Sequence, residues 1–359
     1  MKDSTVRSTA IVFGLDLSDT EATYVGLDSD ARIIEEGKLT LTRMGLEKFF
    51  FGKDRSLVAI EAGTHSPWVS RLLGERGHDV LVANPRQLPL IYRNRRKSDR
   101  LDAITLARLA RSDPELLHPL VHRGQQAQED LAVLRSRDAL VSTRTLLINH
   151  VRGVVKSAGE RLPKCSSESF HRQARAHLPL GLEAALGPVI EQIGQLTTSI
   201  DGYDQKIEQL AQERYPEAQQ VRQPNGVGPI TSLAFVLTLE DPRRFATSRD
   251  VPAYLGLTPG RRQSGTSDPE MHITKAGDVF LRRLLVQAAH YILGPFGTDC
   301  DLRRWGLKLA GTPDAKANGP RKKRAVVAVA RRLAVLLHAL WVNGEPYEPL
   351  RHALRKEAA

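Results

Sequence analysis

The hydrophobic periodicity of this chain changes near residue 125, and this change constrains the fold more than any other feature. Before it, short apolar runs rich in β-branched residues alternate with turns. From Gln125 to Glu213, apolar residues instead recur at helical spacing. The chain has 359 residues, more than one hydrophobic core normally serves. The sequence therefore predicts a multidomain protein, an α/β unit first and helical units after it.

Strand and helix patterns alternate in the first part of the chain. The expected strands cover residues 10–17, 23–27, 32–35, 57–60 and 80–82. The expected helices cover residues 42–51, 66–76 and 99–112, the second of them capped by Ser66 with Pro67 at its first position. Three consecutive strands followed by alternating helix and strand predict a mixed sheet of ribonuclease H type.

The central region carries a broad apolar stripe. Leu134, Val141, Ile148 and Val155 repeat every seven residues. After a break at residues 159–167, a second set resumes the stripe, namely Leu196, Ile200, Tyr203, Ile207 and Leu210. An antiparallel hairpin, an intermolecular coiled coil and ordinary bundle packing would each bury such a stripe.

Further helices are expected beyond Pro216, after the Gly226–Gly228 turn and over residues 280–293 and 325–341. A linker containing Gly, Pro and Lys, residues 311–320, separates the last two. The predicted domains are residues 1–124 (α/β), 125–215 (long helices), 216–310 (mainly helical) and 311–359 (basic linker and terminal helix).

The charge balance favours polyanionic partners. The formal net charge is +11, and each phosphate that a cation neutralises releases condensed counterions. Cations cluster within eight residues at Arg93, Arg95, Arg96, Lys97 and Arg100. A second basic run covers residues 321–324. Such runs are also found on ordinary solvated faces.

Composition argues against a disulfide scaffold, a zinc site or a membrane protein. Cys165 and Cys300 are the only cysteines, without the paired spacing that zinc sites use. The first ten residues lack a signal-peptide core, and apolar runs of about 18 to 20 residues, the length that spans a bilayer, are missing. A cytoplasmic protein is expected.

Four carboxylates form a candidate metal site. Asp16 closes one expected strand, Glu61 follows another, and Asp99 and Asp102 lie three residues apart on an expected helix. Carboxylate oxygens are the ligands that Mg²⁺ or Mn²⁺ prefers, and two such ions can activate the attacking oxygen and stabilise the leaving one in phosphodiester cleavage. Taken singly, each acid could be a cap, a turn residue or a surface charge. His65, four residues after Glu61, is expected to cap or pack.

Two later segments are candidates for contact with phosphate. Gly226 and Gly228 precede a helix, where backbone N–H groups can bind an anion, although a plain helix-entry turn has the same pattern. The loop from Tyr254 to Ser267 carries Arg261, Arg262 and Ser264 between glycines. A serine hydroxyl can attack phosphorus, and nearby arginines can stabilise the charge that develops.

These motifs together resemble the DEDD transposases of insertion sequences, the family that includes the Piv and MooV invertases. The resemblance covers nearly the whole chain. It rests on GLDLS, IEAGTHSPW, KSDRLDA, GVGPITSLAF, YLGLTPGRRQSG and ITKAGDVFLRRLL, in that order.

The resemblance implies a RuvC-like first domain, a coiled-coil dimerisation region and a transposase domain with a nucleophilic serine. It also implies donor and target DNA, a noncoding bridge RNA, and a homodimer that pairs into a tetramer at the nucleoid. By position, Asp16, Glu61, Asp99 and Asp102 correspond to the acidic tetrad, and Ser264 corresponds to the serine before glycine in the family's SSG. Arg282 and Arg283 are further candidates for contact with nucleic acid.

One departure from the family pattern concerns the nucleophile. Gln263 stands where the family often has its first serine, and Thr266 and Ser267 replace the usual Gly-Lys. Ser264 is the preferred nucleophile, with Ser267 and Thr266 as alternatives. Since serine and carboxylates lie in separate predicted domains, the expected active site is composite.

Three other functions share parts of the pattern. A RuvC-like nuclease or junction resolvase would use the carboxylates with water as nucleophile. A non-enzymatic nucleic-acid binder would need only the basic surface. A sugar-kinase or actin-like ATPase would share the opening strands and the GLDLS turn, but it should repeat that turn in its second half, where Ile200-Asp201-Gly202 is the nearest match and lies in a helical pattern.

Overall fold

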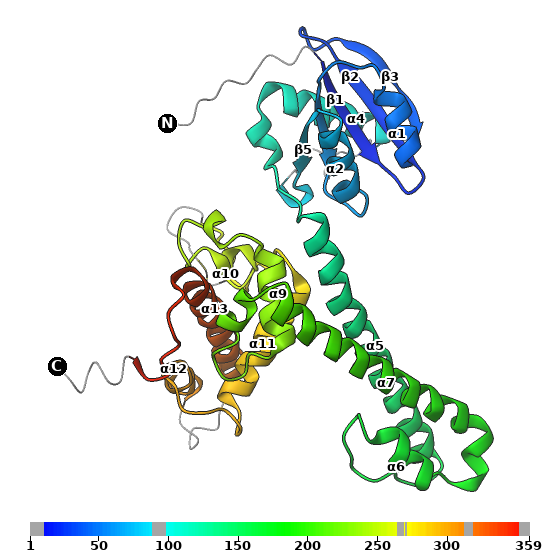
Figure 1. Cartoon of the computed structure of the whole chain (residues 1–359), viewed down its shortest axis with the longest axis vertical. Helices are drawn as coiled ribbons and strands as arrows, with labels where there is room; N and C mark the ends of the chain where they lie inside the picture. The colour runs from blue at the N-terminus through cyan, green and yellow to red at the C-terminus, as the bar shows by residue number, and fades with distance from the viewer. Residues whose placement is uncertain (1–10, 88–97, 264–268, 270, 312–318, 352–359) are drawn as a thin grey trace, which may run out of the picture. The chain divides into compact units, whose positions relative to one another are not determined.

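The chain forms two compact units. The computed structural model describes residues 11–87, 98–263, 269, 271–311 and 319–351. The first unit is Met1–Arg123 and the second is Gly124–Ala359 (Figure 1). Each has its own hydrophobic core. The finer division predicted within the second unit stays a prediction.

A five-stranded mixed sheet forms the first unit. Its strands are β1 (Val12–Leu17), β2 (Glu21–Leu27), β3 (Ile33–Thr40), β4 (Leu57–Glu61) and β5 (Asp79–Ala83), in the order β3-β2-β1-β4-β5. β1, β2 and β3 pair antiparallel, whereas β4 lies parallel to both β1 and β5. The predicted mixed sheet is confirmed. The predicted end of β3 at Glu35 is wrong, because pairing with β2 continues until Thr40 meets Glu21.

Helices cover both faces of this sheet. They are α1 (Arg43–Phe50), α2 (Ser66–Glu75) and α4 (Asp99–Ser112), with short 3₁₀ helices at Pro85–Gln87 and Pro114–Leu117. Successive strand residues point to opposite faces. Phe13 and Leu15 pack with α1 and α2, while Val12 packs with α4. The predicted cap of α2 is corrected: His65 is the N-cap residue and Ser66 begins the helix.

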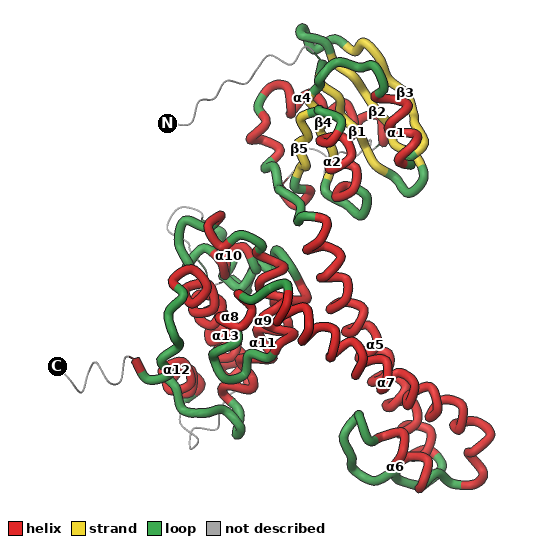
Figure 2. The backbone as a smooth tube through the Cα atoms, in the orientation of Figure 1, coloured by secondary structure: helices red, strands yellow, loops and turns green. Residues whose placement is uncertain are grey.

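A long antiparallel helical hairpin begins the second unit (Figure 2). It consists of α5 (Gln125–Ser157) and α7 (Glu183–Glu213), joined through α6 (Phe170–Ala176) and a 3₁₀ turn at Leu180–Leu182. Ile148 and Val155 of α5 share a core with Ile190 of α7 and Phe170 of α6. Ile148 and Val155 of the predicted stripe are therefore buried within one chain, whereas Val141 is half-buried. α6 was not predicted from the sequence.

The remaining helices form a compact bundle. They are α8 (Glu217–Val221), α9 (Pro229–Leu239), α10 (Val251–Tyr254), α11 (Val279–Leu293), α12 (Asp301–Ala310) and α13 (Gly319–Asn343), with a 3₁₀ turn at Pro242–Arg244. α9 is buried on all sides from Thr231 to Leu239. Leu131, Leu134 and Ile207 of the hairpin join its core. α12 was not predicted, and the predicted linker ends too late, because Gly319 and Pro320 already belong to α13.

α13 is long and apolar enough to cross a membrane, and the described residues contain one such helix. Half of its apolar window is buried inside the protein. Val329, Leu333 and Leu337 are fully buried in the core that α9 and α11 share. Its apolar character is therefore used in packing the second unit.

Candidate active site

Two carboxylates lie side by side at the carboxyl ends of parallel strands. β1 and β4 pair in a register that sets Leu15 beside Ile60, so the next residues, Asp16 and Glu61, follow at the same edge. Leu15 and Ile60 are buried toward α1 and α2. Because side chains alternate along a strand, Asp16 and Glu61 belong to the opposite face, the one that α4 covers.

Gly14 lets α4 approach this face closely. A Cβ atom at Gly14 would lie 2.0 Å from the carbonyl oxygen of Ala103 and 2.6 Å from the backbone nitrogen of Ala107. The helix backbone therefore rests directly on β1. Asp102, in the first turn of α4, is 95% buried as a result of this packing. Ser98 is the N-cap of this helix, since its hydroxyl accepts a hydrogen bond from the Leu101 nitrogen.

Asp16, Glu61 and Asp102 line one pocket of about 390 Å³ in the first unit. We call it the acidic pocket. Its other lining residues are Leu17, Ser18, Asp19, Ala62, Gly63, Thr64 and His65. Three of the four acids predicted from the sequence are thus brought together by β1, β4 and α4.

Asp99 does not line this pocket. It is exposed at the start of α4. On the β3 side, the pKa of Lys38 is raised by its hydrogen bond to Glu21, with a smaller contribution from Asp99. Arg100 pairs with Glu36 of β3 at 2.7 Å. The first turn of α4 therefore lies near β3, and Asp102 is the acid that this helix contributes to the pocket.

The turn that forms one wall of the pocket is tied to α2. The Ser66 hydroxyl accepts a hydrogen bond from the Gly63 nitrogen at 2.9 Å and lies 2.8 Å from Nε2 of His122. Ser66 is completely buried. Burial lowers the pKa of His122, an effect that nearby Arg71 and Arg123 increase. The wall carrying Gly63 and His65 is therefore fixed in place.

The oxygen-rich lining suits a hard divalent cation, but it does not form a closed cage. No group of three Asp, Glu, His or Cys side chains within the described ranges could hold a metal ion by itself. Magnesium is usually bound by one or two carboxylates, with water and substrate phosphate completing the shell. A wide pocket with carboxylates on its walls fits that arrangement better than an all-protein site.

The predicted serine loop belongs to the segment between α10 and α11, residues 255–278, here called the α10–α11 loop. Ser264, Thr266 and Ser267 lie outside the described residues, as do Arg93, Arg95, Arg96 and Lys97 of the basic cluster. Arg261 and Arg262 are exposed on this loop.

Arg282 holds the base of the α10–α11 loop. Its buried guanidinium donates hydrogen bonds to the carbonyl oxygens of Leu255 at 2.9 Å and Ala276 at 2.6 Å. Gly256 and Gly277 both have positive φ, and a Cβ at Gly277 would lie 2.0 Å from the Tyr254 carbonyl oxygen. These hydrogen bonds give Arg282 a structural role, and its predicted contact with nucleic acid stays a prediction. Neighbouring Arg283 pairs with Asp138 of α5.

The glycines of the Gly226–Gly228 turn have different local roles. Gly226 has φ +94°, and a Cβ there would meet Tyr291 at 3.0 Å and Ile292 at 3.2 Å. Gly228 is the N-cap of α9, with open space around it. Packing against α11 accounts for Gly226, and a phosphate contact at either glycine stays a prediction.

Comparison with known proteins assigns the chain to a family. Residues 218–295 match the model described as "Transposase IS116/IS110/IS902 family", and residues 13–159 match a model of DEDD transposases of the IS110 type. A putative transposase y4pF/y4sB of Sinorhizobium fredii is 30% identical over 94% of this chain and 85% of its own length. The chain belongs to the IS110/IS116/IS902 family of transposases.

Other relatives of the transposase match over nearly their full length. A probable family 20 transposase of Pseudomonas aeruginosa is 28% identical over 94% of this chain and 98% of its own length. The transposase for insertion sequence element IS1111A of Coxiella burnetii is 27% identical, covering 94% and 91% of the two chains. The transposase is accordingly an enzyme that cleaves and joins DNA.

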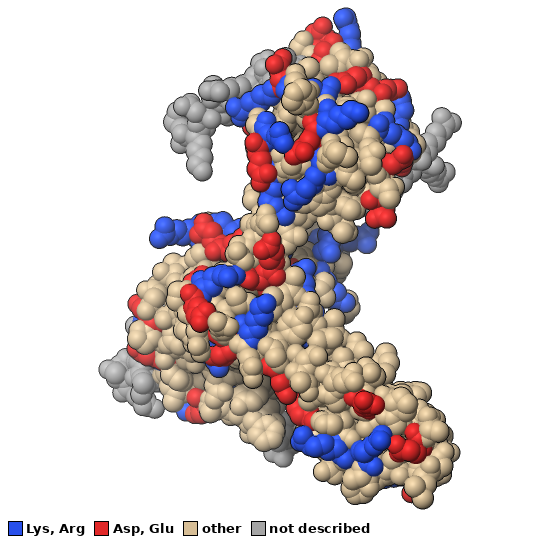
Figure 3. Space-filling model, turned by 45° about the vertical axis from the view of Figure 1, so that its right-hand side comes forward, with Lys and Arg blue, Asp and Glu red and all other residues tan. Residues whose placement is uncertain are grey.

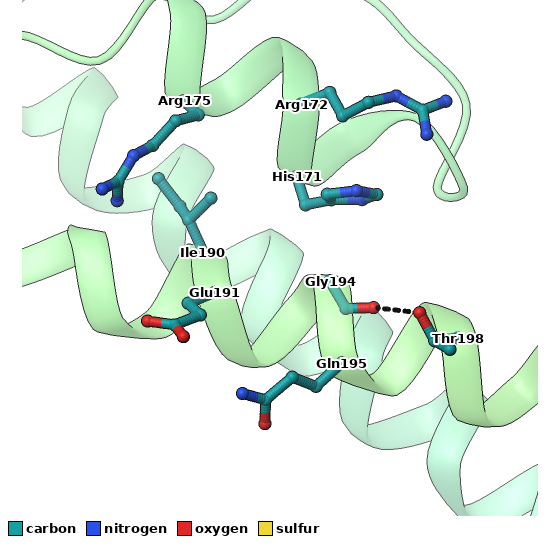
Figure 4. A pocket seen from close by; sticks show the side chains of 8 residues that line it. All are labelled: His171, Arg172, Arg175, Ile190, Glu191, Gly194, Gln195 and Thr198. Atoms are coloured by element: carbon teal, nitrogen blue, oxygen red, sulfur yellow. Dashed lines mark hydrogen bonds between the residues drawn. The ribbon is translucent and has the colours of Figure 1, made fainter.

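A second cavity, of about 480 Å³, lies between α6 and α7 of the hairpin (Figure 4). Arg172 and Arg175 point away from each other there, and Arg175 pairs with Glu183 at 3.0 Å. Their charges do not converge on one ligand. Lys and Arg side chains also form a row near this end of the hairpin (Figure 3).

Proposed function

We propose that the transposase cleaves and exchanges DNA strands through metal-assisted transesterification at the acidic pocket, with Ser264 as nucleophile. One observation carries the proposal: Asp16, Glu61 and Asp102, from three separate elements, line the same pocket. The mixed sheet order and the helices on both faces support an RNase H-like domain of RuvC type.

Asp16, Glu61 and Asp102 would hold Mg²⁺ or Mn²⁺, with Asp99 as an outer member. Bound divalent ions supply Lewis acidity that withdraws charge from phosphate oxygens. By holding these ions, the carboxylates would orient the DNA phosphate. Asp102 can do so with precision because its helix rests on Gly14.

The strand chemistry balances without an external energy source. The Ser264 oxygen forms a bond to phosphorus as the bond from phosphorus to one bridging oxygen breaks, and the serine proton ends on the released strand hydroxyl. In the reverse sense, a hydroxyl of another strand attacks the phosphoserine and releases the serine. The phosphodiester bond energy is retained for rejoining.

Labelled donor DNA and a denaturing gel test the nucleophile. Ser264→Ala is expected to retain DNA binding and to form no covalent protein–DNA adduct, while the matched Ser267→Ala variant still forms it. An adduct that persists in Ser264→Ala would move the nucleophile elsewhere. Free hydroxyl and phosphate ends without any adduct in the wild type would instead favour a hydrolytic nuclease.

We also propose that a bridge RNA guides the transposase to donor and target DNA, and that the cytoplasmic protein acts as a homodimer that pairs into a tetramer. The net charge of +11 supports polyanion binding. Sequencing of copurifying nucleic acid tests the guide: a single discrete RNA species is expected, whereas heterogeneous fragments would contradict it.

A further inference from the structure

His65 lines the acidic pocket from the start of α2. Its side chain is 28% exposed, which leaves part of the ring open to the pocket. The backbone is fixed on both sides, because Ser66 ties back to Gly63 and the Val69 nitrogen donates to the His65 carbonyl oxygen. The fold therefore fixes the backbone position from which the His65 side chain enters the pocket.

Trp68 determines which nitrogen of His65 carries the proton. The indole Nε1 lies 3.1 Å from Nδ1 of His65, with the rings nearly perpendicular at 87°. An indole N–H can only donate a hydrogen bond, so Nδ1 must accept it. The neutral imidazole then carries its hydrogen on Nε2. The ring thus presents an N–H group to the pocket rather than a lone pair.

The rest of the lining consists mainly of hydrogen-bond acceptors. Ten residues of the described part of the chain line the acidic pocket, and among these ten His65 alone has a side-chain nitrogen. Nε2 lies 3.6 Å from the carboxylate of Asp19, which is beyond ordinary hydrogen-bond distance. The Asp19 side chain is 98% exposed and can move aside for an incoming group.

We propose that His65 donates its Nε2–H to a non-bridging phosphate oxygen of the DNA strand in the acidic pocket, and that Trp68 holds the ring in this tautomer. The inference rests on the proposed function, since it requires DNA phosphate at this pocket. In the transition state the phosphate oxygens gain negative charge, and a donor that the fold already holds in place stabilises that charge without reorganising. A proton acceptor or a metal ligand would need the Nε2 lone pair, which this tautomer does not offer.

The first test compares two substitutions at His65 in the full chain, by the single-turnover rate of adduct formation at saturating DNA. His65→Ala removes the donor and is expected to lower the rate by about 10²-fold to 10³-fold, the usual loss for one such donor. His65→Gln keeps an N–H near the Nε2 position and should recover most of the rate. Trp68→Phe keeps the ring packing but frees the tautomer, and should cause a smaller loss than His65→Ala.

One further measurement separates this role from that of a metal ligand. Mn²⁺ affinity, measured by titration calorimetry, should be unchanged in His65→Ala, and a drop would identify His65 as a metal ligand and overturn the proposal. Equal losses in His65→Gln and His65→Ala would also overturn it. His118 is exposed and has a left-handed backbone conformation, which asparagine tolerates, so His118→Asn serves as the matched control. Asp16→Asn tests the proposed function separately: if it forms adduct at the normal rate, the acidic pocket itself is not the active site.

Discussion

Replacing Gly14 by alanine should separate Asp102 from the other two acids of the pocket. The new Cβ would lie 2.0 Å from the Ala103 carbonyl oxygen, and real Cβ contacts shorter than 3.0 Å essentially never occur. The helix α4 must therefore retreat by at least 1.0 Å, because both clashing atoms belong to backbone. Asp102 lies one residue before Ala103 and must move with it.

The expected losses follow from this displacement. Overpacking of a tight contact costs about 1 to 3 kcal/mol of stability. Misplacing a catalytic group by about 1 Å can lower the rate about 10²-fold. The rate of adduct formation and the free energy of unfolding in urea should therefore both fall in Gly14→Ala. The Kd for DNA should change little.

Gly74→Ala is the matched control in the same unit. Gly74 lies near the end of α2, is exposed, and has open space where a Cβ would go. Alanine there should be neutral or stabilise by up to about 1 kcal/mol. If Gly14→Ala has wild-type activity and stability, the close approach of α4 does not position Asp102, and the reasoning about the pocket is wrong.

Three further predictions concern stability. Arg282→Met should remove the donor to the buried Leu255 carbonyl oxygen and to the partly buried one of Ala276, lowering the free energy of unfolding by about 1 to 3 kcal/mol in urea titrations. An unchanged value would mean that the α10–α11 loop closes without this guanidinium. Burial lowers the pKa of His78 and His122, so the folded state holds them neutral while the unfolded chain binds protons near pH 6.5. The stability that they contribute is then present above pH 6.5 and lost as pH falls below it, and His122→Gln should reduce this acid sensitivity in pH-dependent melting. Buried Asp130 accepts hydrogen bonds from Arg214 and Tyr215, and Asp130→Ala should cost about 1 to 3 kcal/mol; a Tm equal to that of the wild type would contradict a structural role.

Much of the first unit follows from residue patterns alone. The β-branched runs predict β1 and β4, and their strand-end acids predict Asp16 and Glu61 as neighbours. The start and end of α4 also follow, because Ser98 caps it and Pro114 stops it. These signals are local in the sequence, and β1, β4 and α4 form where the signals predict them.

The rest of the site depends on packing that one sequence does not display. Asp99 and Asp102 have equivalent spacing signals, and the packed position of α4 is needed to show that Asp102 lines the pocket. A glycine inside a strand indicates close backbone approach, so Gly14 could have been singled out from the sequence. His65 and Trp68 lie one helical turn apart, but their hydrogen bond depends on ring orientation.

Short helices and the burial of arginines also could not be predicted from sequence patterns. α6 and α12 are short, and packing within the second unit rather than long periodicity stabilises them. The structural role of Arg282 could not be predicted from the sequence. Its burial and its two carbonyl partners become visible only once α11 is packed against the α10–α11 loop.

The most direct test of the central claim is anomalous diffraction from crystals of the full chain grown with donor DNA and Mn²⁺. A manganese peak is predicted in the acidic pocket, about 2.1 Å from carboxylate oxygens of Asp16 and Asp102 or Glu61, with a DNA phosphate oxygen completing its shell. Manganese bound elsewhere, with these three side chains contacting only protein, would contradict the account.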